Sequence, residues 1–147
     1  MAENYISQIQ EMEVFDTGRK HVALVIDDYF LIRHNFKLLL EKMGLSVNEA
    51  KNGQEALDLL AAYGAEKFSL IIVDLAMPIM NGTEFLAKAK KVFSNKLPPV
   101  LVCSSNTDVP QIKKIISLGI NGYILKPIDF KALMNKVREL VPGISQA

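Results

Sequence analysis

Five polar side chains stand at the ends of short apolar segments, where they could carry out chemistry: Asp27, Asp28, Asp74, Ser104 and Lys126. Three carboxylates brought together repel one another, and they stay ionised at neutral pH only beside a compensating cation. Oxygen ligands of this kind suit Mg²⁺, which takes one or two carboxylates together with carbonyl oxygens and water. A carboxylate flanked by a divalent cation, an amine and a hydroxyl is equipped to accept a phosphoryl group. Asp74 is the candidate nucleophile, and the product would be an acyl phosphate.

Each of these residues also has a simpler structural interpretation. Asp74 could cap a turn, because Asp often precedes loops that contain Pro and Gly. Asp27 could be the N-cap of the following helix, Ser104 could belong to an ordinary loop, and Lys126 could be a solvated charge. The chemical interpretation is favoured because each of these residues stands at the end of a short apolar segment.

The rest of the chain alternates between strand-like and helix-like segments. Segment 70–73 is an unbroken run of branched apolar residues, which is typical of a strand buried on both faces of a parallel sheet. Further strands are predicted at 21–26, 46–50, 100–103 and 122–125. Apolar residues at helical spacing predict helices over 29–43, 54–63, 83–93 and 109–118, and Asp129 is expected to cap a last helix that ends near Leu140.

Five strands that alternate with five helices over short loops predict an α/β fold. The pattern requires right-handed crossovers and a doubly wound, five-stranded parallel sheet with helices on both faces. The carboxyl ends of parallel strands lie on one rim, and this is where ligands bind in open α/β sheets. Every predicted strand but the second ends beside one of the polar residues above, so we expect these side chains to converge on one pocket.

Size and composition indicate one compact domain. The 147 residues, half of them apolar and 22% charged, suit a single ordinary core. A net charge of +1 does not favour nucleic acid or a membrane as partner, and no apolar run approaches the ~20 residues of a membrane helix. The start of the chain does not read as a signal peptide. The single cysteine, Cys103, is expected to be buried and reduced, which fits the cytoplasm.

Residues 1–20 are expected to form a leader apart from a domain at 21–141, with a short tail at 142–147. Ile6, Ile9 and Met12 recur at near-helical spacing, so the leader could hold a short amphipathic helix. Three interpretations of the leader stay open: a disordered segment, a helix packed on the domain, or a dimer contact.

The chain resembles a receiver domain of two-component response regulators, of the stand-alone chemotaxis type. The family pattern is an acidic pair after the first strand, an acceptor Asp after the third, Ser or Thr after the fourth, and Lys-Pro after the fifth. This sequence meets the pattern with Asp27-Asp28, Asp74, Ser104 and Lys126-Pro127. Segments 77–82 and 119–127 also match, and the resemblance covers about residues 20 to 141. It implies a flavodoxin-like receiver fold with strand order 2-1-3-4-5.

The resemblance also implies a role for each residue of the pocket. Asp74 would be phosphorylated by a histidine kinase or a phosphotransfer protein, and Lys126 would bind a phosphoryl oxygen. Mg²⁺ would be bound directly by Asp28, Asp74 and the backbone carbonyl of Ala76, and by Asp27 mainly through water.

Ser104 and Tyr123 would form the switch. Ser104 would move to hydrogen-bond the phosphate, and Tyr123 would turn inward into the vacated space. The face formed by the helix at 109–118, the strand at 122–125 and the last helix would change shape and bind a downstream target protein. Tyr123 could instead be an ordinary half-buried strand aromatic. No nucleic acid or membrane partner is expected, and a homodimer stays open.

Three other interpretations compete with this one. The chain could be a receiver cut from a longer regulator or hybrid kinase, or a receiver that binds partners without phosphate. An aspartyl phosphatase of the haloacid dehalogenase type needs a second Asp two residues after the nucleophile, and that position is Ala76. We therefore expect a phosphoacceptor that assists its own phosphorylation and dephosphorylation, and not an enzyme. Ala76 and Asn106 also occupy the positions that help to set phosphate lifetime in the family.

Overall fold

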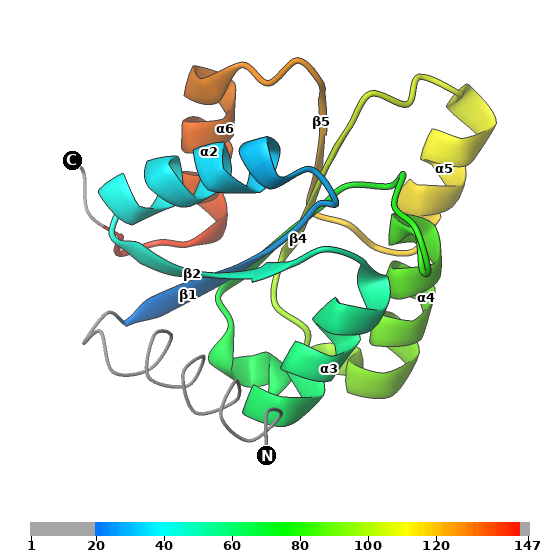
Figure 1. The fold of residues 1–147 in the computed structure, drawn as a ribbon, viewed down its shortest axis with the longest axis horizontal. Coiled ribbons are helices and arrows are strands. Elements are labelled where there is room, and N and C mark those ends of the chain that lie inside the picture. Colours follow the sequence, from blue (N-terminus) through cyan, green and yellow to red (C-terminus); the bar gives the residue numbers. More distant parts are fainter. Residues whose placement is uncertain (1–19, 145–147) are drawn as a thin grey trace.

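The computed structural model describes residues 20–144, which form a parallel sheet covered by helices (Figure 1). The strands are β1 (His21–Ile26), β2 (Leu45–Ala50), β3 (Leu70–Val73), β4 (Val100–Ser104) and β5 (Gly122–Leu125). The helices are α2 (Phe30–Lys42), α3 (Gly53–Tyr63), α4 (Gly82–Phe93), α5 (Val109–Ser117) and α6 (Phe130–Leu140), with short 3₁₀ turns η1 (Ala65–Lys67) and η2 (Ser94–Lys96). The sheet has the order β2-β1-β3-β4-β5 with all pairs parallel, so the predicted α/β class and strand order are confirmed.

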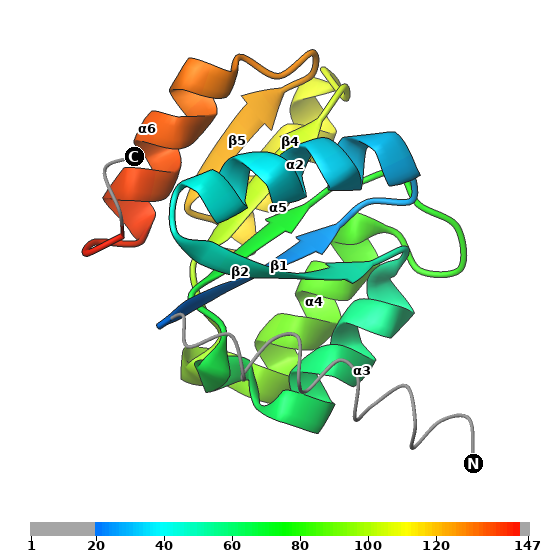
Figure 2. The ribbon, with the colours of Figure 1, turned by 60° about the vertical axis from the view of Figure 1, so that its left-hand side comes forward.

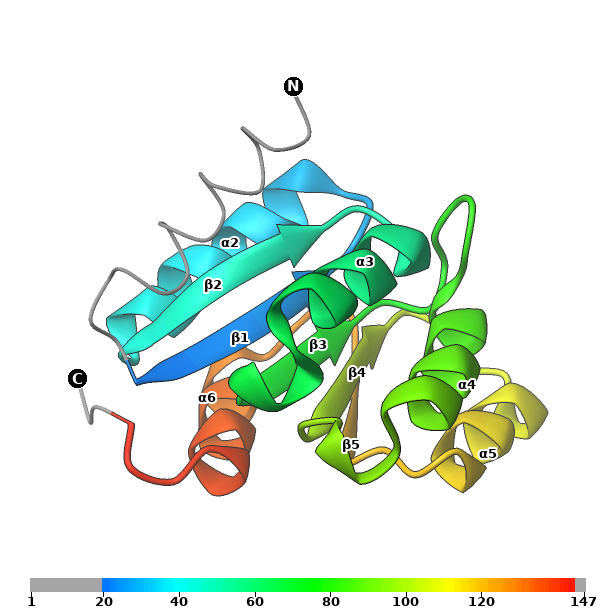
Figure 3. The same cartoon turned by 90° about the horizontal axis from the view of Figure 1, so that it is seen from below.

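The helices divide between the two faces of the sheet (Figures 2 and 3). Helices α2 and α6 cover one face, and α3, α4 and α5 cover the other. Side chains of a strand alternate between faces, and in β1 the residues Val22, Leu24 and Ile26 enter the α3–α5 core, while Ala23 and Val25 enter the α2–α6 core. Both sets are buried, which explains why the central strands read as unbroken apolar runs.

Side-chain caps fix where the helices begin. The Asp129 carboxylate accepts hydrogen bonds from the backbone amides of Lys131 and Ala132, as predicted for the N-cap of the last helix. At the start of α4, Asn81 and Glu84 each accept the other's backbone amide, a complete capping box. This box anchors α4 directly after the loop that follows β3.

Element bounds differ from the predicted ones by one residue at several ends. Ser104 is the last residue of β4 and not the first residue of a loop. The 3₁₀ turns η1 and η2 were not predicted, because three residues are too few to show an apolar period. These differences do not move any predicted site residue away from the rim of the sheet.

The packed part of the structure continues beyond α6. Val141 and Ile144 are buried in the α2–α6 core, although a tail was predicted from residue 142. The predicted domain bounds stay a prediction, and the expectations for the leader fall outside the described residues except for Lys20. Within residues 20–144, no helix is both long enough and apolar enough to cross a membrane.

Candidate functional site

The carboxyl ends of β1 and β3 bring two predicted carboxylates together. These strands pair with Ile26 opposite Val73, so Asp27 and Asp74, the next residues along each chain, are neighbours at the rim. Asp28 follows in the turn to α2, and the three side chains can each place an oxygen within 4.8 Å of the other two. Asp27 and Asp74 are buried, whereas Asp28 is exposed. The structure therefore gathers all three predicted acids into one cluster, which is open to solvent at Asp28.

Lys126 reaches this cluster from the end of β5. Its backbone amide donates to the Ser104 carbonyl at 2.9 Å, which holds the residue at the rim. Its Nζ lies 2.9 Å from Asp27 Oδ2 and 3.5 Å from Asp74 Oδ2. Burial alone would lower the pKa of this amine, but the hydrogen bond to Asp27 and the charges of Asp27 and Asp74 raise the pKa above its usual value. Lys126 is therefore a charged partner of two acids.

Asp74 lies at the centre of the arrangement. Its Oδ1 accepts the backbone amide of Leu75 at 2.8 Å, and the amide of Ala76 also bonds to its carboxylate. Its Oδ2 faces Lys126. Burial raises the pKa of Asp74, and the nearby Asp27 charge adds to this, while Lys126 and the two amides oppose it. The raised pKa means that the ionised carboxylate is held in the site at a cost.

The donor set fits a hard divalent cation. Three carboxylates and one lysine amine leave two negative charges uncompensated within the cluster. Carboxylate oxygens are the ligands that Mg²⁺ prefers, and the exposed side at Asp28 leaves room for the waters that Mg²⁺ retains. The backbone carbonyl of Ala76 as a further ligand stays a prediction.

Ser104 and Tyr123 meet through one residue of the loop after β4. The Ser104 hydroxyl oxygen accepts the Asn106 amide at 3.2 Å, and the Tyr123 hydroxyl donates to the Asn106 carbonyl at 2.8 Å. Burial raises the pKa of the Tyr123 phenol, against the opposing effect of a hydrogen bond with Ser104. Ser104 and Tyr123 are thus connected through Asn106, and their role as a switch stays a prediction.

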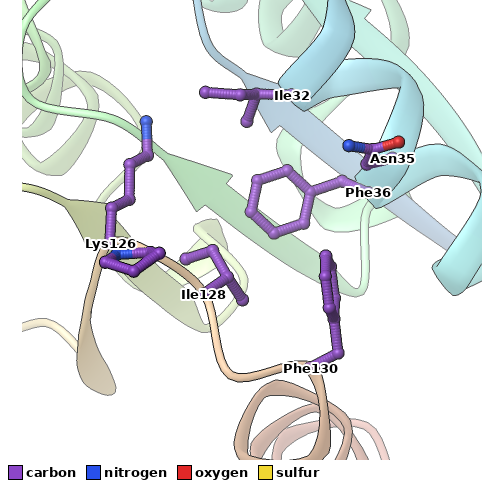
Figure 4. A pocket seen from close by; sticks show the side chains of 7 residues that line it. Ile32, Asn35, Phe36, Lys126, Ile128 and Phe130 are labelled. Atoms are coloured by element: carbon purple, nitrogen blue, oxygen red, sulfur yellow. The ribbon is translucent and has the colours of Figure 1, made fainter.

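An apolar pocket of about 330 Å³ lies beside the cluster, between α2 and the segment that joins β5 to α6 (Figure 4). Its lining includes Ile32 and Phe36 from α2, with Ile128 and Phe130 from the other side. Lys126 also contributes to the wall, so the pocket and the acidic cluster share one residue.

A comparison with protein families identifies the family of this chain. The family model described as the response regulator receiver domain matches residues 23–138. The chain belongs to the response regulator receiver family. Receiver domains are signalling switches controlled by phosphorylation, and they generally bind Mg²⁺ at an acidic pocket.

Individual relatives agree with this assignment. The uncharacterized transcriptional regulatory protein YkoG of Bacillus subtilis is 30% identical over 115 residues, which is 78% of this chain and 48% of YkoG. The chemotaxis protein CheY of Halobacterium salinarum is 27% identical over 119 residues, 81% of this chain and 95% of that CheY. The structure of CheY4 from Vibrio cholerae matches with a TM-score of 0.73 and 27% identity, covering 82% of this chain and 98% of CheY4. This receiver domain therefore spans about half of YkoG and nearly all of the chemotaxis proteins.

Gly82 holds the loop at 74–81, named the acceptor loop after the predicted acceptor Asp74, against α4. Its amide donates to the Leu75 carbonyl at 2.9 Å, and a Cβ at this position would lie 2.3 Å from the Asp74 carbonyl oxygen. Because the clash is with backbone, Gly82→Ala should lower the free energy of unfolding by about 2 kcal/mol or more. Urea denaturation measures this, with Ala87→Gly at an exposed position of α4 as a control that should cost about 1 kcal/mol. A Gly82→Ala variant as stable as the wild type would contradict the close approach.

The raised pKa of Asp74 predicts a stability effect in the metal-free receiver domain. The folded state binds a proton on Asp74 at higher pH than the unfolded chain, so this residue's contribution to stability falls as pH rises from about 3.8 through the folded pKa. Asp74→Asn should therefore unfold at higher urea concentration than the wild type at neutral pH without Mg²⁺.

Two further measurements check the cause of that stability gap. The gap between Asp74→Asn and the wild type should narrow as pH is lowered toward 3.8, where Asp74 of the wild type is protonated. Mg²⁺ should stabilise the wild type more than the variant, because a ligand stabilises the state that binds it. A gap that widens on acidification would show that the Asp74 charge is not its origin.

Sequence reasoning did not single out Arg33, which contacts the backbone beside the cluster. Arg33 is buried, and one of its guanidinium nitrogens donates to the Asp27 carbonyl. A signal was present, because Arg33 stands three and seven residues before Phe36 and Leu40, the other buried residues of α2. An arginine on the apolar face of a helix is unusual unless it has partners.

Proposed function

We propose that this receiver domain accepts a phosphoryl group on Asp74 from a histidine kinase or a phosphotransfer protein, with Mg²⁺ at the acidic cluster. The observation that carries the proposal is the position of Asp74: a buried carboxylate at the rim, with Lys126 Nζ 3.5 Å from Oδ2 and two further acids beside it. A lone capping Asp would need neither the amine nor the other acids.

The chemistry is a displacement at phosphorus. A carboxylate oxygen of Asp74 forms a bond to phosphorus as the bond from phosphorus to the donor histidine nitrogen breaks, and that nitrogen leaves with the electron pair. Bound at Asp27, Asp28 and Asp74, Mg²⁺ would supply positive charge to the transferring oxygens. Lys126 already lies against Asp27 and Asp74, so its amine is placed to pair with a phosphoryl oxygen.

The proposed donor is a protein, and exposed apolar residues around the rim support this. Tyr29, Phe30 and Leu31 at the start of α2 and Ile79 in the acceptor loop all expose most of their surface. Exposed apolar side chains that cluster at one place are more often part of a protein contact than of an ordinary solvated surface. The apolar pocket beside Lys126 adds further apolar surface from the same helix, with Ile32 and Phe36 in its wall.

The output is proposed to act through Ser104 and Tyr123. A phosphate on Asp74 brings about two negative charges at neutral pH, which gives the Ser104 hydroxyl a strong acceptor. Because Ser104 and Tyr123 both bond to Asn106, movement of Ser104 would be transmitted to the aromatic ring. The α5–β5–α6 face, where Ile116 and Leu125 are exposed, is proposed to bind the downstream target.

The relatives support two settings for this switch. The near-complete match to CheY of Halobacterium salinarum favours a stand-alone regulator, and the match to half of YkoG favours a receiver within a longer regulator. We propose that it acts in the cytoplasm, where a single buried cysteine stays reduced. Enzymatic turnover as a phosphatase is not proposed, because Ala76 supplies no acid two residues after Asp74.

Beryllofluoride, which mimics an aspartyl phosphate, tests the proposal. With Mg²⁺, it should shift the amide resonances of Asn106 and Tyr123 in the wild type and leave those of Asp74→Asn unchanged. Mg²⁺ alone is the control for metal binding without the phosphate mimic. Unchanged resonances in the wild type would favour a receiver that binds partners without phosphate. A steady-state phosphatase assay that gives many turnovers per protein would favour an enzyme.

A further inference from the structure

Arg33 is a buried cation in the first turns of α2. Its side chain is 10% exposed, and the residue shares the inward face of the helix with Phe36 and Leu40. An arginine keeps its charge when buried and needs acceptors for its donors. The acceptors that Arg33 finds belong to two other parts of the fold.

The Arg33 guanidinium connects the edge strand β2 to the end of β1. Its Nε donates to Glu49 Oε1 on β2 at 3.1 Å, and a terminal nitrogen donates to the backbone carbonyl of Asp27 at 2.6 Å. The Phe30 ring lies 5.9 Å from the guanidinium carbon. Because the guanidinium is planar and rigid, these contacts fix one another's direction.

The bond to the Asp27 carbonyl determines how the chain continues into Asp28. The carbonyl of Asp27 and the amide of Asp28 share one peptide plane. Asp27 is also held through its amide, which donates to the Ala50 carbonyl at 3.1 Å, and through its carboxylate, which accepts the Tyr29 amide at 2.9 Å. Those two bonds hold the amide and the side chain of Asp27. The bond from Arg33 instead holds the carbonyl, which shares a peptide plane with the Asp28 amide.

Asp28 depends on this backbone because it lies on the open side of the cluster. It is the one exposed acid of the three, and the Lys126 amine that pairs with Asp27 and Asp74 does not pair with it. The peptide between Asp27 and Asp28 sets the position of the Asp28 Cα, and so limits where its carboxylate can lie.

We propose that Arg33, held by Glu49, is a positioning residue for the divalent cation, because it fixes the peptide that carries Asp28. The inference rests on the proposed function only in that Mg²⁺ binds the acidic cluster. Through Glu49, the edge strand β2 would influence metal affinity although it contributes no side chain to the cluster. Outer residues that orient metal ligands commonly change metal affinity by about 10- to 100-fold when they are removed.

If the Arg33–Glu49 ion pair had only a structural role, the Arg33 variants would behave differently. Removal of Arg33 would then lower stability, while the folded fraction would bind Mg²⁺ as tightly as before. A purely electrostatic role would also differ, because a positive charge on α2 repels Mg²⁺, so removing such a cation would tighten Mg²⁺ binding. Lys37 lies one turn further along the same helix, so Lys37→Gln removes the same charge without touching the Asp27 carbonyl.

The test is calorimetric titration of the full chain with Mg²⁺. Arg33→Gln should weaken Mg²⁺ binding about tenfold, whereas Lys37→Gln should bind like the wild type. Arg33→Lys should fall between Arg33→Gln and the wild type, since an ammonium can reach one acceptor but cannot hold both in one plane. Glu49→Gln keeps an oxygen for Arg33 Nε and should stay close to the wild type.

Amide hydrogen exchange gives a readout without any metal. In the metal-free protein, Arg33→Gln should accelerate exchange at the Tyr29 amide, which donates to the Asp27 carboxylate, and Lys37→Gln should not. If Arg33→Gln does not fold, Arg33→Lys provides both measurements.

Two results would overturn the inference: folded Arg33 variants with wild-type Mg²⁺ affinity, or equal losses in Arg33→Gln and Lys37→Gln. Failure of the proposed function looks different, because the wild type would then bind Mg²⁺ but take up no phosphoryl group. A wild type that binds no Mg²⁺ would overturn both.

Discussion

Replacing Asp74 by Asn is expected to abolish phosphoryl uptake, with a fall in labelling rate of at least about a thousandfold. A carboxamide is a far weaker nucleophile than a carboxylate and cannot form the acyl phosphate. The substitution keeps an oxygen that can accept the Leu75 amide, now bonded at 2.8 Å, so the acceptor loop should be preserved. The loss should therefore reflect chemistry and not unfolding.

The measurement is acid-labile phosphate on the protein after incubation with acetyl phosphate and Mg²⁺. Asp58→Asn on α3 is the matched control, because it makes the same chemical change at an exposed carboxylate away from the rim. It should label like the wild type. Equal labelling of Asp74→Asn and the wild type would show that another residue takes up the phosphoryl group.

Replacing Lys126 by Ala is expected to leave weak phosphoryl uptake and to remove the conformational response. The amine lies 2.9 Å from Asp27 Oδ2 and 3.5 Å from Asp74 Oδ2, and no other lysine or arginine within residues 20–144 pairs with either acid. Loss of one preorganised donor to a transferring group commonly costs about a hundredfold in rate. The carboxylate and the Mg²⁺ ligands would remain, so some label should still be incorporated.

The Lys126→Ala experiment needs two readouts on the same samples. Label incorporation reports on chemistry, and the Asn106 and Tyr123 amide shifts with beryllofluoride report on the response. Lys131→Ala, at an exposed lysine in the first turn of α6, controls for the loss of one positive charge. A full amide response in Lys126→Ala would count against the coupling role of the amine.

Much of the architecture could be predicted from the sequence because the signals are local. The run 70–73 and the similar runs around it mark strands, and helical spacing marks what lies between them. Once the strands are parallel, Asp27, Asp74, Ser104 and Lys126 must lie on one rim, and the structure places them there. The alternation of strands and helices was therefore enough to predict that these side chains meet at one rim.

Other features could not be predicted because they depend on distances between elements. The position of Arg33 on the apolar face of α2 does not say that its partners are Glu49 and the Asp27 carbonyl. The need for glycine at 82 arises from the approach of α4 to the Asp74 carbonyl. The hydrogen bond from Tyr123 to the Asn106 carbonyl depends on one rotamer of the ring. Each is set by packing, for which a single sequence holds no direct signal.

The burial of Ile144 has a practical consequence for how this molecule can be handled. The segment at 141–144 packs back on the sheet, and Gly143 lies beside the ring of His21, the first residue of β1. The acidic rim lies at the far end of this six-residue strand, about 20 Å away at 3.3 Å per residue. A dye or a bead attached through the exposed Lys20 would sit at the opposite pole and leave the approach to Asp74 unobstructed.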